Sequence, residues 1–189
     1  ISKDEKTVYF SSNRPGGYGG LDLYKATKDA KGEWSNVKNI GPKINSPEDD
    51  DAPFIDYDGV TLYFSSMGRK GMGGFDIFKS VYDPMTNEWS EPENLGYPIN
   101  TPDDDVYFVT SKDSKRAYYS SVREDGIGYT DIYMITIPEG LKNLPPADQV
   151  EPKTEEPIVS TDPQPDTPET PVVVPEKKEI RPLKFVVKV

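Results

Sequence analysis

VYFSSNRPGGYGGLDLYK, residues 8–25, contains most of what the sequence says about the fold. Its β-branched and aromatic start predicts a short strand, Arg-Pro-Gly-Gly predicts a turn, and a second strand follows from Asp22. The stretch returns as LYFSSMGRKGMGGFDIFK at residues 62–79 and as AYYSSVREDGIGYTDIYM at residues 117–134. The aligned tyrosines are 54 and then 55 residues apart. A constant period of this size is typical of a repeat architecture.

A second block of sequence repeats with the same period. Trp34 returns as Trp89, each followed by a serine, and INSP at residues 44–47 returns as INTP at residues 99–102. One period contains four short predicted strands in antiparallel order, and such a meander of about 50 residues is a blade of a β-propeller. Apolar residues show no useful 3.6-residue period, so almost no helix is expected. The predicted fold class is all-β, with the four-stranded antiparallel C-terminal blades of a β-propeller.

The predicted strands form groups of three, four and three. They span residues 7–12, 22–27 and 34–40, then 52–56, 60–65, 76–82 and 89–94, then 106–110, 116–121 and 131–137. Residues 41–51 are predicted to be a polar connection. Because a propeller needs roughly four to eight blades to close, we expect further blades upstream of Ile1. Upstream sequence is also expected to complete the last blade, with residues 184–189 (KFVVKV) as the competing candidate.

Composition divides the chain into three segments. All aromatic residues except Phe185 precede Pro138, and more than half of the 19 prolines lie from Pro138 onward. Residues 1–137 are therefore predicted to form a partial propeller with a buried core. Residues 138–182 are predicted to be a disordered or extended Pro/Glu/Thr-rich linker, and residues 183–189 to begin a further β domain.

Charge and missing residue types exclude several classes of function. The formal net charge of −11 argues against a nucleic-acid partner, because nucleic-acid binding requires a basic face. The chain has no cysteine and no histidine, which excludes thiol nucleophiles and Cys-based zinc sites and removes the commonest general base. No stretch of about 18 apolar residues is present, so no direct membrane span is expected.

Three linked motifs resemble the WD40-like, TolB-type β-propeller repeat. They are YFSSNRPGGYGGLDLYK from residue 9, WSNVKNIGPKINSPEDDDAPFI from residue 34 and DYDGVTLYFSS from residue 56. The variant is similar to the one in large, peptidoglycan-associated, OmpA-family envelope proteins of Bacteroidota. The resemblance covers roughly residues 1–137, and the third repeat departs from it with KDS at residues 112–114, where the second repeat has YDG.

The resemblance implies a location and a set of partners. Such proteins join a propeller to a small carboxypeptidase-regulatory-like β-sandwich and to an OmpA-like peptidoglycan-binding domain, which is not in this chain. The resemblance therefore implies a periplasmic, outer-membrane-associated protein that binds other envelope proteins and reaches peptidoglycan through that further domain. It also implies a subunit of a secretion, transport or assembly complex, for example in type IX secretion.

Several recurring residues are predicted to build the blades. The turn glycines are expected to allow positive φ, and the aspartate that follows them to cap backbone N–H groups of the turn. The tryptophans are expected to pack between blades. These structural positions are Gly19, Gly73, Gly128, Asp22, Asp76, Asp131, Trp34 and Trp89.

Two acidic runs are candidate calcium ligands. Clustered carboxylates on a loop can bind Ca²⁺, a hard cation that takes oxygen ligands. The runs recur in register, however, which favours a structural or solvated role, and no other cofactor is expected. The candidates are Asp49, Asp50, Asp51, Asp103, Asp104 and Asp105.

No catalytic residue is predicted, and the module is expected to be a non-enzymatic, protein-binding scaffold. The recurring serine pairs have no histidine to serve as a base. Of the arginines, only Arg14 and Arg69 are expected to share a turn position, which is too few for a sialidase-like site. Two alternatives stay open, a glycan- or cell-wall-binding propeller and an accessory propeller of an enzyme whose catalytic domain lies outside this chain.

Overall fold

The structure, a computed structural model, describes residues 1–124 and 126–136. The predicted linker at residues 138–182 and the predicted β domain at residues 183–189 lie outside these residues, as does residue 137. The described part of the chain consists of strands, turns and connections and has no helix that could cross a membrane. The strands are β1 (Thr7–Ser12), β2 (Asp22–Lys28), β3 (Trp34–Asn39), β4 (Asp50–Ile55), β5 (Thr61–Ser66), β6 (Asp76–Asp83), β7 (Glu88–Trp89), β8 (Glu93–Asn94), β9 (Asp105–Thr110), β10 (Arg116–Ser121) and β11 (Asp131–Thr136).

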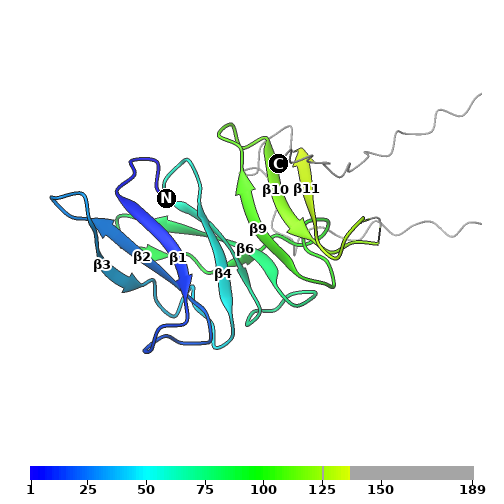
Figure 1. The fold of residues 1–189 in the computed structure, drawn as a ribbon, viewed down its shortest axis with the longest axis horizontal. Helices are drawn as coiled ribbons and strands as arrows, with labels where there is room; N and C mark the ends of the chain where they lie inside the picture. Colours follow the sequence, from blue (N-terminus) through cyan, green and yellow to red (C-terminus); the bar gives the residue numbers. More distant parts are fainter. Residues whose placement is uncertain (125, 137–189) are drawn as a thin grey trace, which may run out of the picture.

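The strands form three antiparallel sheets, which we call blades 1, 2 and 3. Blade 1 has the order β1-β2-β3, blade 2 the order β4-β5-β6-β7 with β8 also paired to β6, and blade 3 the order β11-β10-β9. The blades follow one another along the long axis of the molecule, from blue through green to yellow (Figure 1). The predicted all-β fold of antiparallel propeller blades is therefore confirmed.

The predicted strand boundaries differ from the structure by a residue at several strand ends, and three differences affect the account of the blades. The strand predicted at residues 89–94 is divided into β7 and β8, because Pro92 lies between them and cannot donate a hydrogen bond to the ladder. The connection predicted at residues 41–51 is shorter, since β4 begins at Asp50. Likewise, β9 begins at Asp105, one residue before the start predicted for that strand. Part of each acidic run therefore belongs to a sheet rather than to a loop.

Two apolar cores lie between neighbouring blades. Successive side chains of β5 point to opposite faces of the sheet, so Leu62 and Phe64 join one core while Tyr63 joins the other. The core between blades 1 and 2 contains Leu23, Ile44, Ile55, Leu62, Phe64, Phe78 and Trp89. The core between blades 2 and 3 contains Tyr63, Ile77, Ile99, Phe108, Ala117, Tyr119 and Tyr133. Blade 2 is thus covered on both faces.

A comparison of β1 with β5 shows what a neighbouring blade contributes to burial. Their sequences, TVYFSS and TLYFSS, differ only at Val8 and Leu62. Every residue of β5 is buried, whereas every residue of β1 is only half-buried. Because the sequences are nearly the same, the difference arises from position. Blade 2 lies between two blades, and blade 1 has one neighbour in the described structure.

Phe64 and Phe10 allow a matched test of this inter-blade packing. They share a repeat position, and each stacks on an aromatic ring of the next strand with 6.0 Å between ring centroids. Phe64 is 1% exposed, so we expect Phe64→Ala to lower the free energy of unfolding by about 3–5 kcal/mol. We expect Phe10→Ala to cost less than half as much. Urea denaturation followed by tryptophan fluorescence measures both values, and equal losses would contradict this account of the core.

Candidate functional site

The glycine-rich turn of each blade is fixed by the aspartate that begins the strand after the turn. The carboxylate accepts hydrogen bonds from backbone amides three and four residues earlier, which closes the turn. The bonds run from Tyr18 N to Asp22 (2.9 Å), from Met72 N (2.9 Å) and Gly73 N (3.2 Å) to Asp76, and from Ile127 N (2.7 Å) and Gly128 N (3.2 Å) to Asp131.

Each of these turns presents a large hydrophobic side chain to solvent at the same repeat position. Tyr18 is 52% exposed, Met72 45% and Ile127 71%. These three residues, which we call the tip row, occupy the same repeat position and therefore lie at the same end of successive blades. Each is also a residue whose backbone amide the aspartate binds. Sequence reasoning missed the row because the residue type differs in every repeat.

Gly16 in the turn of blade 1 has a positive φ of 89°, as expected of a turn glycine, but the recurring glycines of these turns do not. None of Gly19, Gly73 and Gly128 has a positive φ, so the expectation from the sequence is wrong for these three residues. A Cβ atom at Gly19 would overlap the carbonyl oxygen of Glu48, and one at Gly73 would overlap that of Asp103. A Cβ atom at Gly128 would meet no described atom closer than 3.8 Å. Close packing of the connection against the turn therefore requires glycine in blades 1 and 2.

Gly73→Ala and Gly128→Ala test this explanation with the same substitution at the same repeat position. Gly73→Ala is expected to cost roughly 1–3 kcal/mol of folding free energy, because the backbone at Asp103 must shift. Gly128→Ala is expected to change the folding free energy by less than about 0.5 kcal/mol. Urea unfolding followed by circular dichroism measures the difference. A loss at Gly128 as large as that at Gly73 would contradict the role assigned to close packing.

A buried asparagine joins each connection to the blade before it. Asn45 Oδ1 accepts a hydrogen bond from Leu23 N at 2.7 Å, and Asn45 Nδ2 donates to Leu23 O at 3.0 Å. Asn100 forms the same two bonds with Ile77, at 2.8 and 3.0 Å. Each side-chain amide thus satisfies both backbone groups of a buried strand residue. The repeated motifs INSP and INTP mark these asparagines in the sequence as recurring residues. A loop asparagine does not by itself predict, however, which strand it binds.

The aspartates of the acidic runs accept hydrogen bonds from different backbone and side-chain groups. The donors are Leu21 N to Asp49 (2.7 Å), Phe75 N to Asp104 (2.9 Å), Ser46 N to Asp50 (2.5 Å), Thr101 N to Asp105 (2.5 Å) and the Ser11 hydroxyl to Asp51. Asp103 instead contributes the carbonyl oxygen packed on Gly73. Within the described residues, no three acidic side chains come together as a metal site. Calcium binding stays a prediction from the sequence alone.

Burial raises the pKa of Asp50 and Asp105 above the ordinary aspartate value. Hydrogen bonds from nearby serine side chains and backbone amides, and the charges of Arg69 and Arg123, lower the pKa again, but desolvation is the largest effect. Ionisation is therefore less favourable in the folded than in the unfolded chain. The contribution of each protonated carboxyl to stability is complete below the unfolded pKa and is lost as pH rises through the folded pKa.

The double variant Asp50→Asn, Asp105→Asn should expose this pH dependence. As pH falls from about 7 to about 4, the unfolding free energy of the wild type should rise relative to that of the variant. Urea denaturation at a series of pH values measures the difference. Asp83→Asn is the control, because hydrogen bonds lower the pKa of that exposed carboxyl and no such gain is expected. A difference that does not change with pH would refute the assignment.

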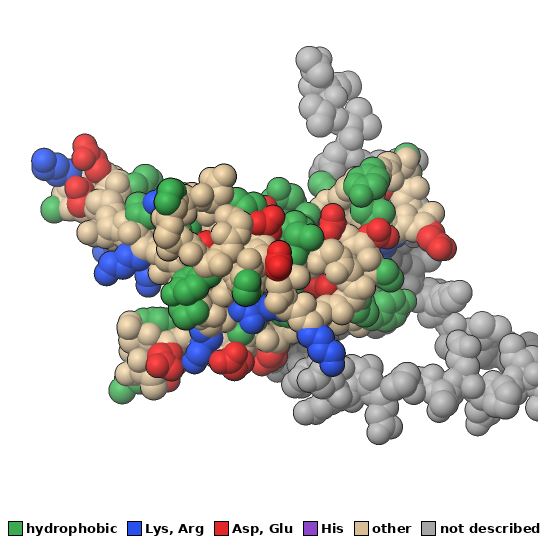
Figure 2. Space-filling view, turned by 90° about the horizontal axis from the view of Figure 1, so that it is seen from below, with side chains coloured by type: hydrophobic (Ala, Val, Ile, Leu, Met, Phe, Trp, Pro, Cys, Tyr) green, Lys and Arg blue, Asp and Glu red, His purple; other side chains and the backbone are tan. Residues whose placement is uncertain are grey.

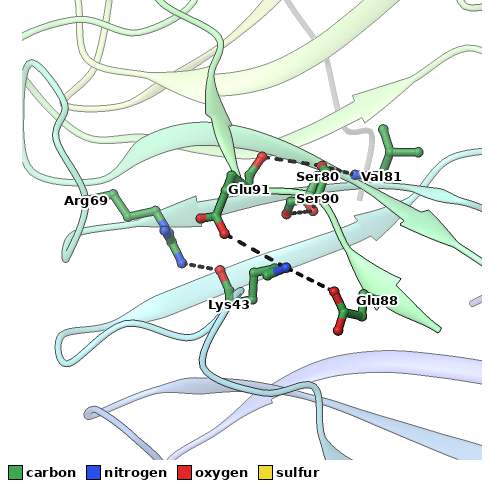
Figure 3. A network of polar contacts seen from close by, with 7 residues as sticks. All are labelled: Lys43, Arg69, Ser80, Val81, Glu88, Ser90 and Glu91. Atoms are coloured by element: carbon green, nitrogen blue, oxygen red, sulfur yellow. Dashed lines mark hydrogen bonds and ion pairs between the residues drawn. The ribbon is translucent and has the colours of Figure 1, made fainter. Parts of the chain in front are cut away.

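An arginine in the turn joins the connection to the blade that follows it. The side chain reaches two consecutive carbonyl oxygens of the connection, and Figure 3 shows the bond from Arg69 to Lys43. The acceptors are Lys43 O and Ile44 O for Arg69 (both 2.8 Å), and Pro98 O (2.5 Å) and Ile99 O (3.2 Å) for Arg123. Since these donors are charged, the bonds are stronger than those between neutral groups.

The prediction that only Arg14 and Arg69 share a turn position is wrong. Arg123 shares it too, because all three guanidinium groups lie over aromatic rings of their own blades, 4.7–5.9 Å from the centroids. Arg14 and Arg123 follow their serine pairs at the same spacing, so the sequence already contained this match, whereas Arg69 follows its pair by one residue more.

The two tryptophans share a repeat position but differ in burial. Trp89 is 8% exposed and packs edge-to-face on Tyr9 of blade 1, with 6.4 Å between ring centroids. Trp34 is 43% exposed, and the ammonium group of Lys28 lies 5.0 Å from its ring centroid. In the described structure, only Trp89 has the inter-blade position expected of both. Trp34 would need a blade on the other side of blade 1.

A shallow groove of about 540 Å³ follows β1 and the first strands of blades 2 and 3. Ala52 and Tyr107, at equivalent positions, have φ values of 53° and 60°, and the strand pairing shifts beside them. These β-bulges bend β4 and β9 where the groove passes. The lining residues are Phe10, Ser11, Asp51, Ala52, Pro53, Phe54, Tyr107 and Val109. The groove offers apolar contact area, and within it the Ser11 hydroxyl donates a hydrogen bond to the Asp51 carboxylate.

Comparisons with known proteins support the fold. No protein-family model matches the sequence, and no curated protein matches it. Among solved structures, the chain is similar to TolB from Acinetobacter baumannii, with a TM-score of 0.50 and 16% sequence identity. The similarity covers 75% of this chain and 30% of TolB, so the chain spans less than a third of that β-propeller protein. At this level of identity the comparison establishes a TolB-like propeller fold.

Proposed function

We propose that this chain is a non-enzymatic, protein-binding scaffold module of a bacterial cell-envelope protein. In this proposal the protein is periplasmic and associated with the outer membrane, and a domain outside this chain binds it to peptidoglycan. It acts as a subunit of a secretion, transport or assembly complex, for example in type IX secretion. The resemblance of the repeat to that of Bacteroidota envelope proteins supports the location, and the TolB-like fold is compatible with it.

The tip row is the observation that most directly supports protein binding. It places three large apolar side chains in water, one at the same end of each blade. The aspartate caps fix the backbone under them, so a partner would meet an ordered surface and little conformational entropy would be lost on binding. Apolar side chains on a rigid scaffold are typical anchors of protein interfaces.

The recurring polar residues support a scaffold rather than an enzyme. The aspartates, asparagines and arginines that repeat with the blades bind backbone groups of their own or neighbouring blades. Such groups are engaged in holding the fold together, so they are poor candidates for chemistry on a substrate. Basic, acidic and hydrophobic side chains are interspersed on the face drawn in Figure 2, without a large patch of one charge. That surface suits a protein partner better than a strongly charged polymer.

The test is a gentle detergent pull-down of the full-length native protein from envelopes, with bound proteins identified by mass spectrometry. The triple variant Tyr18→Ser, Met72→Ser, Ile127→Ser is compared with the wild type. We expect the wild type to recover stoichiometric outer-membrane partners and the variant to lose at least nine-tenths of them, because the apolar anchors are removed.

Met85→Ser is the matched control for the pull-down. Met85 is 91% exposed, in the turn between β6 and β7 at the opposite end of blade 2, and its replacement should leave partner recovery unchanged. Equal recovery by the triple variant would remove the tip row as the binding surface. Recovery of the protein alone, or with peptidoglycan fragments only, would contradict the complex-subunit proposal and favour a wall anchor or glycan binder.

A further inference from the structure

β1 has one edge that no strand of the described structure occupies. The corresponding strands of the other blades are both paired on two sides, β5 with β4 and β6, and β10 with β9 and β11. β1 pairs with β2 alone and ends its sheet. An unpaired edge presents a row of backbone N–H and C=O groups that can bind another extended chain. The question is which kind of chain the neighbouring side chains would select.

The other two blades show what binds at this position. Residues 41–55 and 96–110, which we call the handover segments, each contain a polar connection followed by the first strand of the next blade. The first handover segment adds β4 antiparallel to β5, with Asp50 opposite Ser66. The second adds β9 antiparallel to β10, with Asp105 opposite Ser121.

Arginine supplies a second contact to each handover segment. Arg69 binds two carbonyl oxygens of the first segment, and Arg123 binds the equivalent two of the second. Each arginine also acts electrostatically on the buried aspartate of its segment, Asp50 or Asp105. Strand pairing, a carbonyl clamp and an aspartate beside an arginine and a serine thus occur together in both blades.

Blade 1 contains the same receptor groups without a handover segment. Ser12 is the counterpart of Ser66, and Arg14 is the counterpart of Arg69. The Arg14 guanidinium lies 5.1 Å from the Phe10 ring centroid, on the same strand position that Arg69 covers in blade 2. Arg14 Nε donates to Ser12 Oγ at 3.2 Å, and no carbonyl oxygen of the described residues accepts a hydrogen bond from Arg14. The Arg14 guanidinium therefore lies where its counterparts lie in blades 2 and 3. The described residues, however, do not supply the carbonyl oxygens and the aspartate that lie beside those counterparts.

We propose that the free edge of β1, together with Arg14 and Ser12, is a docking site for a third handover segment. The occupant is an extended chain with a polar connection, an aspartate at the start of its strand and apolar residues after it. It adds antiparallel to β1 as the first strand of blade 1. Backbone hydrogen bonds supply affinity, while the arginine and serine select the aspartate. This site is independent of the tip row and goes beyond the proposed function.

The test uses the whole chain and a peptide with the sequence of residues 41–56, GPKINSPEDDDAPFID, acetylated and amidated at its ends. We expect binding by isothermal titration calorimetry and slower amide hydrogen exchange in β1. Replacing the peptide aspartate that corresponds to Asp50 with asparagine should weaken binding at least tenfold. Arg14→Gln in the protein should do the same, whereas Arg116→Gln, on an exposed position of β10, should not.

Three outcomes would overturn the proposal. The first is no binding, or no added protection in β1. The second is equal affinity of the aspartate and asparagine peptides, or of the wild type and Arg14→Gln, which would leave strand pairing without the proposed selection. The third is protection of β1 without peptide in a species of twice the expected mass, because that result would make a second copy of the chain the occupant.

Discussion

The fold depends on the coverage of each blade by its neighbours. A blade has apolar side chains on both faces, and no side chain within its own sheet can cover them. β5 is buried throughout because blades 1 and 3 lie against blade 2, whereas β1, with nearly the same sequence, is half-buried. The contribution of a core residue to folding stability therefore depends on the interface between two blades. Stability in such an architecture is a sum of blade terms and nearest-neighbour terms.

The connections between blades turn this stacking into a defined arrangement. Each is bound to the preceding blade by an asparagine such as Asn45 and to the following blade by an arginine such as Arg69, which binds the carbonyl oxygens of the two residues just before that asparagine. A buried hydrogen bond of this kind contributes only about 0.5–1.5 kcal/mol net, but leaving its backbone partner unsatisfied would cost more. The polar residues thus set the register of one blade on the next, while the apolar residues supply the energy. The turns beside them become rigid as a consequence.

Much of the fold could be predicted because its signals are local or periodic. Aromatic and apolar residues identify β1 and β5, and the constant period identifies the blade. The contacts of the turns depend on residues far away in the sequence and could not be predicted. The need for glycine at Gly73 comes from a carbonyl oxygen of Asp103 in the next connection. The shared position of Arg14 and Arg123, by contrast, could have been found from their equal spacing after the serine pair, and only Arg69 is displaced by one residue.

The repeat also limits where recognition can be encoded. Positions that keep the same residue in every blade, such as Asp22 and its counterparts, are engaged in contacts that every blade needs. A substitution there would alter the packing before it altered a binding preference. Positions that vary in residue type while staying exposed carry no such constraint, and Tyr18, Met72 and Ile127 are of this kind. A repeat architecture therefore separates the residues that maintain the fold from those that are free to distinguish partners, and the second group is found where the repeats differ.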